Sequence, residues 1–319
     1  MKRSTNRRGY PENVVEGRHL KLKDLKEEAQ RVGLGNTYLG KDNIPTSPRP
    51  DFHVSHLTHD TDQAGLRGIR GDHGFKNPFK TSRLQESLLW WTLIVGPDEI
   101  ASAERRLLEE AYPDRTEEQA QMQQSFLGKF ATSPAFQKTS RLGSYRFSFP
   151  LEELLKAYSE QLCAGAQPVM RQLRTILYKQ EVVHVVLVHS PANQELFSDH
   201  PLLTDDPNAV CTYKDGCFIW RPEAMSETHN YQLVRRDDEQ QMEAEMLFTH
   251  QFYVWDSVAV ALHVGQQVLH FDAGRLRETL SFCTVGQAPI NRSYTFDGFS
   301  QAQDLVKELW PDDPTPLEG

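Results

Sequence analysis

Apolar residues recur along this chain with two spacings, one typical of helices and the other typical of strands. In residues 20–32 they fall every three or four positions, and the run ends at Gly33, which predicts a short amphipathic helix. The same spacing predicts further helices after Asp98, after Thr116, over residues 151–162 and over residues 301–310.

Strands are predicted where branched and aromatic residues cluster between turn residues. Residues 87–95 form an apolar run that Gly96 and Pro97 end, as expected of a buried strand. Residues 144–149 alternate aromatic and polar side chains, and residues 181–189 are rich in valine. Because these strands and helices do not alternate regularly, the predicted fold class is α+β. Further strands are predicted over residues 217–220, 231–234, 252–260 and 268–271.

Proline, glycine and charge divide the chain into three regions. Residues 1–50 are predicted to form a polar tail, a short helix and a linker. Residues 51–310 are predicted to form a single α+β domain, and residues 311–319 a second tail. Within the domain we expect a core over residues 51–190 and an extension, residues 191–310, packed on that core.

The composition is typical of a soluble protein, with 38% hydrophobic and 25% charged residues among 319. The net charge of −9 argues against a surface that as a whole attracts nucleic acid or anionic lipid. Residues 1–19 are polar and basic with no apolar run behind them, so we expect a disordered start and no secretory signal. The longest apolar run, residues 182–188, is too short to span a membrane. Four cysteines are too few for a disulfide framework, which favours a cytoplasmic location, with a nuclear one possible.

The most informative stretch is residues 51–75, in which glycines punctuate a short apolar pattern. We expect a strand to Thr58, a helix capped near Asp60 or Thr61, and a glycine turn that returns the chain at Phe75. Each glycine inside a helix costs about 1 kcal/mol relative to alanine, so stability does not favour them. Close approach of the backbone to a ligand or to another strand is the better explanation.

Three further features have residue types suited to catalysis or binding, and each also has a purely structural explanation. His56 and Thr58 form a His-x-Thr motif on the first strand, where a lone histidine is more often satisfied at a sheet edge. A serine-bearing turn from Ser140 leads into Tyr145, as in many hairpins. Glu181 begins a valine-rich strand, where its carboxylate would point either to solvent or into a cleft.

In this order, the motifs resemble the ADP-ribosyltransferase superfamily, in the branch that includes the poly(ADP-ribose) polymerases and the transfer-RNA 2′-phosphotransferases. That branch has His-x-Thr on a first strand, then a helix and an Ile-x-x-Gly-Phe turn, then a serine turn before a tyrosine, and finally a glutamate on a valine-rich strand. The corresponding residues are His56, Thr58, Ile69, Gly71, Gly74, Phe75, Ser140, Tyr145 and Glu181, with four residues rather than two between Ile69 and Gly74.

The resemblance implies two split antiparallel sheets around a cleft that binds NAD as co-substrate, with no metal. Glu181 would hold the ribose 2′-hydroxyl and offset the charge of an oxocarbenium-like transition state, with His56 as its catalytic partner. Thr58, Tyr145, Ser140, Gly71 and Phe75 would bind NAD, with an aromatic ring stacked on nicotinamide. ADP-ribose would pass to an unknown acceptor, a protein or a small molecule.

The resemblance also implies two structural expectations. His56 and Glu181 should lie on neighbouring strands and face one pocket. If the acceptor were nucleic acid, a group of cations should gather beside the cleft, because the chain as a whole is acidic. Those cations are Arg67, Arg70, Lys76, Lys80 and Arg83.

Other functions fit parts of the same stretch. His53, His56 and His59 beside acidic residues suggest a metal site, but His53 and His56 would point to opposite faces of one strand. A two-histidine phosphoesterase would need a second, separated His-x-Ser/Thr motif downstream on a strand, which is missing. The main alternative is a binding or regulatory protein without catalysis, and binding of NAD alone does not require activity.

Overall fold

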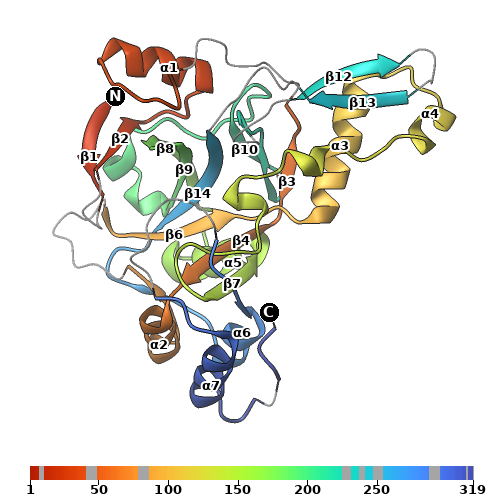
Figure 1. Cartoon of the computed structure of the whole chain (residues 1–319). Coiled ribbons are helices and arrows are strands. Elements are labelled where there is room, and N and C mark those ends of the chain that lie inside the picture. The colour runs from red at the N-terminus through yellow and green to blue at the C-terminus, as the bar shows by residue number, and fades with distance from the viewer. Residues whose placement is uncertain are drawn as a thin grey trace.

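The computed structural model describes residues 1–6, 11–40, 49–77, 86–224, 231–236, 241–246, 254–286, 295–313 and 315–318. It confirms the α+β class, because helices surround one large, mostly antiparallel sheet and several small sheets. Figure 1 shows α1 (Leu22–Arg31) at one end of the molecule and α2 (Gln63–Asp72), α6 (Ala273–Glu278) and α7 (Phe299–Leu309) gathered at another. No helix among the described residues has the length and apolar character needed to cross a membrane.

The large sheet has nine strands in the order β1-β2-β8-β9-β14-β6-β4-β7-β16. Only β9 and β14 run parallel to each other, and the remaining neighbours are antiparallel. In this order the strands are Lys2–Thr5, Pro11–Glu16, Val169–Tyr178, Glu181–His189, Trp255–His263, Leu88–Leu93, His56–Thr61, Tyr145–Pro150 and Leu280–Phe282.

Three small sheets complete the strand inventory of the described residues. The first pairs β10 (Cys211–Lys214), β11 (Cys217–Trp220) and β3 (Phe52–Val54). The second is a hairpin that projects beside α3 (Pro97–Ala111) and α4 (Glu117–Gln121) in Figure 1. The hairpin strands are β12 (Tyr231–Arg236) and β13 (Gln241–Met246), and the third sheet pairs β15 (Val268–His270) with β5 (Gly74–Lys76).

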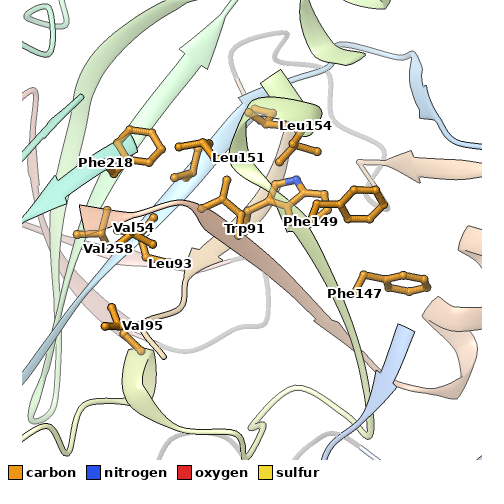
Figure 2. Close-up of a cluster of buried hydrophobic side chains, with 14 of the residues drawn as sticks. Val54, Trp91, Leu93, Val95, Phe147, Phe149, Leu151, Leu154, Phe218 and Val258 are labelled. Carbon is orange, nitrogen blue, oxygen red and sulfur yellow. The ribbon is translucent and has the colours of Figure 1, made fainter. Parts of the chain in front are cut away.

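The main hydrophobic core lies on one face of the large sheet. Its strands contribute Trp91, Phe147 and Phe149, and α5 (Leu151–Leu162) covers them with Leu151 and Leu154 (Figure 2). Phe147 and Phe149 project to the same side because side chains two residues apart on a strand share a face. The polar residues between them therefore point to the opposite face, where the candidate site lies.

Most predicted elements are confirmed within a few residues. The helices begin where capping residues or proline permit: α2 after Asp62, α3 (Pro97–Ala111) at Pro97, and α4 (Glu117–Gln121) after Thr116. The Asp62 side chain accepts a hydrogen bond from the backbone N–H of Gly65 at 3.0 Å. Within the described residues, four short 3₁₀ helices also occur: Leu127–Lys129, Pro134–Phe136, Pro191–Asn193 and Glu195–Phe197.

The prediction of a disordered start over residues 1–19 is wrong for the part that the structure describes. β1 pairs with β2, and β2 pairs with β8, so the N-terminal residues extend the large sheet. Val14 and Val15 are buried there, which accounts for the pairing of an otherwise polar segment. The division into a tail, a core and an extension stays a prediction.

Candidate functional site

A small pocket lies on the polar face of the large sheet and has a cavity volume of about 50 Å³. Strands β4, β6 and β7 form its floor, and the segment that leads into β7 forms its wall. The pocket combines hydroxyl, carboxylate and guanidinium groups with a few apolar side chains. Its lining residues are Thr58, Asp60, Thr92, Leu93, Ile94, Pro134, Thr139, Arg141, Leu142 and Arg146.

Arg146 and Asp60 fix one side of this pocket. They are opposite each other on neighbouring strands β7 and β4, and their side chains form two hydrogen bonds of 2.7 and 2.8 Å. The Arg146 guanidinium also donates to the carbonyl oxygens of Gln137, Lys138 and Thr139. Arg146 therefore ties the pocket wall to the pocket floor.

Arg141 and Glu181 form the other charged pair. Arg141 lines the pocket and donates to both carboxylate oxygens of Glu181 at 2.7 and 2.8 Å, and the Glu181 side chain is 6% exposed. Burial alone would lower the pKa of Arg141, but the charge and hydrogen bonds of Glu181 raise it. The two side chains therefore form a salt bridge at the edge of the pocket.

The His-x-Thr motif lies at the start of β4. Thr58 is buried, lines the pocket and directs its hydroxyl toward the carbonyl oxygen of Thr92 at 3.4 Å. His56 is exposed, and its Nδ1 lies 3.1 Å from the hydroxyl of Ser55. Of the two motif residues, only Thr58 lines the pocket.

The expectation that His56 and Glu181 lie on neighbouring strands is wrong. β14 and β6 lie between β9, which carries Glu181, and β4, which carries His56. Three steps of about 4.8 Å separate these strands, so they are roughly 14 Å apart. The side chains of His56 and Glu181 do share one face of the sheet. Pairing across β4, β6, β14 and β9 places Thr58 and Val185 in one row. His56 lies two residues before Thr58 and Glu181 four residues before Val185, so each points to the same face as its neighbour in that row.

Tyr145 lies on the opposite face. Its ring is fully buried in the main core, and its hydroxyl donates to Asp297 Oδ2 at 2.6 Å. Burial and this hydrogen bond raise the pKa of the Tyr145 hydroxyl. Ser140 is also buried, and its hydroxyl accepts from the backbone N–H of Leu142. Neither residue lines the pocket.

The two remaining predicted site residues, Phe75 and Gly71, do not line the pocket. Phe75 is buried among aromatic rings, with Trp91 and Phe147 at centroid distances of 5.0 and 5.2 Å. Gly71 lies in the last turn of α2, and nothing lies within 4 Å of a Cβ placed there. Of the predicted set, Thr58 alone lines the pocket, and Glu181 adjoins it through Arg141.

The cations proposed for a nucleic-acid acceptor are bound to other groups where the structure describes them. Arg67 forms a bidentate pair with Glu308, and Lys76 pairs with Asp72. Arg70 donates to the carbonyl oxygen of Leu309 and lies over the Trp310 ring. Lys80 and Arg83 lie outside the described residues.

The histidines considered as metal ligands are divided between two sheets. His53 belongs to β3, whereas His56 and His59 belong to β4. His59 donates from Nδ1 to the carbonyl oxygen of Trp90 at 2.8 Å, and burial lowers its pKa. Among the residues that the structure describes, no group of three or more His, Cys, Asp or Glu side chains has an arrangement that could hold a metal ion.

Comparison with known proteins adds no relative, since no family model, curated protein or solved structure matches this chain. The site therefore has to be interpreted from its own chemistry. Sequence patterns did not identify Arg141, Arg146 or Asp297 as site residues, and they indicated Asp60 only as a candidate helix cap or metal ligand. The side-chain pairs of these residues join positions 40 to 152 residues apart, and the signal in the sequence was only that each is charged and close to an apolar strand or turn.

Proposed function

We propose that this chain is an ADP-ribosyltransferase-like protein that binds a ribose-containing nucleotide, such as NAD or ADP-ribose, without transferring ADP-ribose. The resemblance rests on the His-x-Thr strand, and the order β4, α2, β5 follows the strand, helix and glycine turn expected of that family. In this proposal the family's split sheets correspond to the two regions of the nine-stranded sheet that carry Thr58 and Glu181.

The observation that carries the non-catalytic part of the proposal is the state of Glu181. Both of its carboxylate oxygens accept hydrogen bonds from Arg141, so its charge is already compensated. A carboxylate that stabilises an oxocarbenium-like centre must direct its charge at the developing cation. Tyr145 supports the same conclusion, because its hydroxyl is bonded to Asp297 on the opposite face.

The pocket chemistry supports a ribose as the recognised group. A carboxylate next to hydroxyls and guanidinium donors can bind a vicinal diol, and acidic side chains bind ribose hydroxyls in nucleotide sites. The Asp60 carboxylate retains acceptor capacity beyond its bonds to Arg146, and Thr58 contributes a hydroxyl. At about 50 Å³ the cavity admits only the hydroxyl edge of a ribose, and the rest of the nucleotide would extend along the sheet face.

The test measures binding and chemistry side by side on the purified chain. Calorimetry should detect ADP-ribose and NAD, while a nicotinamide assay should detect no release. Thr58→Val removes the pocket hydroxyl at nearly constant volume and should weaken binding about tenfold, as expected for one lost hydrogen bond. Tyr145→Phe is the matched control and should bind with unchanged affinity, because its hydroxyl lies on the other face.

Two results would contradict this function in different ways. If the wild-type chain releases nicotinamide, and Glu181→Gln slows this release on the order of 10²–10³-fold, the chain is a transferase. Absence of binding for both nucleotides would remove the ligand altogether and leave an interaction protein. If the chain were a transferase, its acceptor would be sought among proteins and small molecules. Arg67, Lys76 and Arg70 are each bonded to another group and form no free basic patch for nucleic acid.

A further inference from the structure

Residues 190–203 fold back across the edge of the large sheet at the end of β9. Three bonds hold this segment to β8: Gln172 N–H donates to the carbonyl oxygen of Pro201, Leu203 N–H donates to that of Met170, and Arg171 Nη1 donates to that of His200. The distances are 2.9, 2.9 and 2.6 Å, respectively. Arg171 is the only side chain among these contacts, and it is 6% exposed.

The segment buries Phe197 against the sheet. Phe197 is 1% exposed, and its ring centroid lies 5.0 Å from the ring of His189 and 5.0 Å from that of His263. It belongs to an apolar cluster with Leu187 and Ala261 from strands β9 and β14. Release of the segment would therefore expose an apolar part of the sheet.

His189 determines the position of Arg171. Its Nε2 accepts a hydrogen bond from Arg171 Nε–H at 2.9 Å, and its Nδ1 donates to the carbonyl oxygen of Ser190 at 2.8 Å. A carbonyl oxygen can only accept and a guanidinium can only donate, so the two bonds require the neutral Nδ1–H tautomer. A proton on Nε2 would place two donors and two positive charges against each other.

We propose that His189 and Arg171 form an acid-released clasp that holds residues 190–203 on the sheet. When His189 takes up a proton, the Arg171 side chain loses its acceptor and withdraws. The bond from Arg171 to the His200 carbonyl oxygen is then lost with it, and Phe197 is exposed. This inference is independent of the nucleotide pocket, which lies on other strands.

The charges around His189 favour this response. Burial is the main cause that lowers its pKa, the Ser190 carbonyl oxygen opposes the shift, and Arg171, His263 and His200 lower it further. Burial lowers the pKa of His200 as well. The nearby carboxylates of Glu16 and Asp199 raise that pKa, whereas Arg174 and Arg171 lower it. The α5 side contributes Tyr158, whose hydroxyl donates to the His263 carbonyl oxygen, and Cys163, which contacts Ser190.

The sign of the effect follows from the lowered pKa. The closed segment holds His189 neutral, whereas the opened segment lets it titrate near its ordinary value of about 6.5. Opening therefore takes up a proton and becomes more favourable as the pH falls below about 6.5. Until the lowered pKa is reached, the opening constant should rise by up to about tenfold per pH unit.

Hydrogen exchange on the full chain tests the clasp. Exchange of peptides from residues 190–203, corrected for the intrinsic effect of pH on amide exchange, should accelerate by up to about fivefold between pH 6.5 and 5.5. His189→Gln keeps an acceptor near the Nε2 position and cannot take up the proton, so the acceleration should disappear. The control, His270→Gln, changes an exposed histidine on β15 and should keep the wild-type response.

Equal acceleration in wild type and His189→Gln would overturn the proposal, as would wild-type exchange that does not depend on pH. If His189→Gln fails to fold, histidine nitrogen resonances of the wild-type chain replace it. They should report the neutral Nδ1–H tautomer at pH 7.5 and a protonation midpoint of His189 that coincides with the opening of residues 190–203. A protonated His189 in a segment that stays closed would also overturn the clasp.

Discussion

At the scale of single residues, the partner of a charged group determines its role. Glu181 begins a valine-rich strand, and the sequence allowed either a solvated carboxylate or one that points into a cleft. The structure adds a third possibility, because Arg141 meets the carboxylate at the pocket wall. A buried carboxylate without such a partner would be strongly destabilising.

Arg141→Met should lower the free energy of unfolding by about 3 kcal/mol, since it leaves Glu181 buried and unpaired. The double variant Arg141→Met with Glu181→Gln should recover part of this loss, because no isolated charge remains. Arg67→Met is the control: its partner Glu308 is 59% exposed, so solvent screens the pair and its loss should change stability far less. Urea unfolding measures all three, and equal losses for the Arg141 and Arg67 variants would contradict the buried pair.

Asp256 gives a second prediction at this scale. Its carboxyl group accepts from the backbone N–H groups of Glu223 and Ala224, and burial raises its pKa to about 8. The folded chain therefore holds a proton that the unfolded chain releases near pH 3.9. Between these two values the contribution of Asp256 to stability falls as the pH rises, by up to about 1.4 kcal/mol per unit.

Asp256→Asn should remove that dependence, because the amide does not titrate and still offers one acceptor oxygen. Urea unfolding at pH 5, 6.5 and 8 measures the slope. Asp98→Asn, an exposed residue in the first turn of α3, should retain the wild-type slope. If Asp256→Asn keeps the wild-type slope of unfolding free energy against pH, that slope arises from another group.

At the scale of elements, the glycines of the region around β4 and α2 divide into two groups. A Cβ on Gly65 would lie 1.9 Å from the Thr61 hydroxyl, and one on Gly143 would lie 2.1 Å from the Thr61 carbonyl oxygen. Nothing lies within 4 Å of a Cβ on Gly68 or Gly71. Close approach to the β4 backbone therefore explains Gly143, and contact with the Thr61 side chain explains Gly65, but neither explains Gly68 or Gly71.

Gly143→Ala should destabilise the chain by about 3 kcal/mol, because the residue has φ +141° and its Cβ would overlap the Thr61 backbone. Gly71→Ala should instead stabilise α2 by up to about 1 kcal/mol. Thermal unfolding distinguishes them, and nucleotide binding by Gly71→Ala should be unchanged. If Gly71→Ala folds stably but binds the nucleotide more weakly, Gly71 belongs to the binding site.

Local patterns predicted the helices and most strands because caps, prolines and apolar spacing lie within each element. The 151–162 prediction coincides with α5, and 181–189 coincides with β9. β8 was not predicted as a strand, because the arginines and the glutamine of Val169–Tyr178 hide its alternation. β2 was missed because two valines among polar residues are a weak signal, and its partner strand is more than 150 residues away.

At the scale of the whole molecule, the order of strands separates residues that the motifs had grouped. His56, Tyr145 and Glu181 occupy β4, β7 and β9, and β14 enters between β9 and β6 from the last third of the chain. Strand order depends on pairing between distant segments, which hydrophobic spacing does not encode. The motifs therefore predicted the elements correctly, whereas the arrangement of the site required the structure.

The N-terminal strands give a prediction at the same scale. β2 pairs with residues 174–177 of β8, and β1 in turn covers β2, so removal of both leaves this part of β8 unpaired along one side. An open strand edge promotes pairing with other chains. Deletion of residues 1–16 also removes buried Val14 and Val15, which should cost about 3 kcal/mol or more.

The deleted chain should therefore unfold at lower urea concentration and associate as its concentration rises, which light scattering after size exclusion measures. Deletion of residues 1–5 is the matched control, because it removes β1 and leaves β2 on the β8 edge. That shorter deletion should stay monodisperse wherever the full chain does. If the two deletions behave alike, the edge of β8 does not depend on β2, and residues 11–16 do not contribute to the sheet in solution.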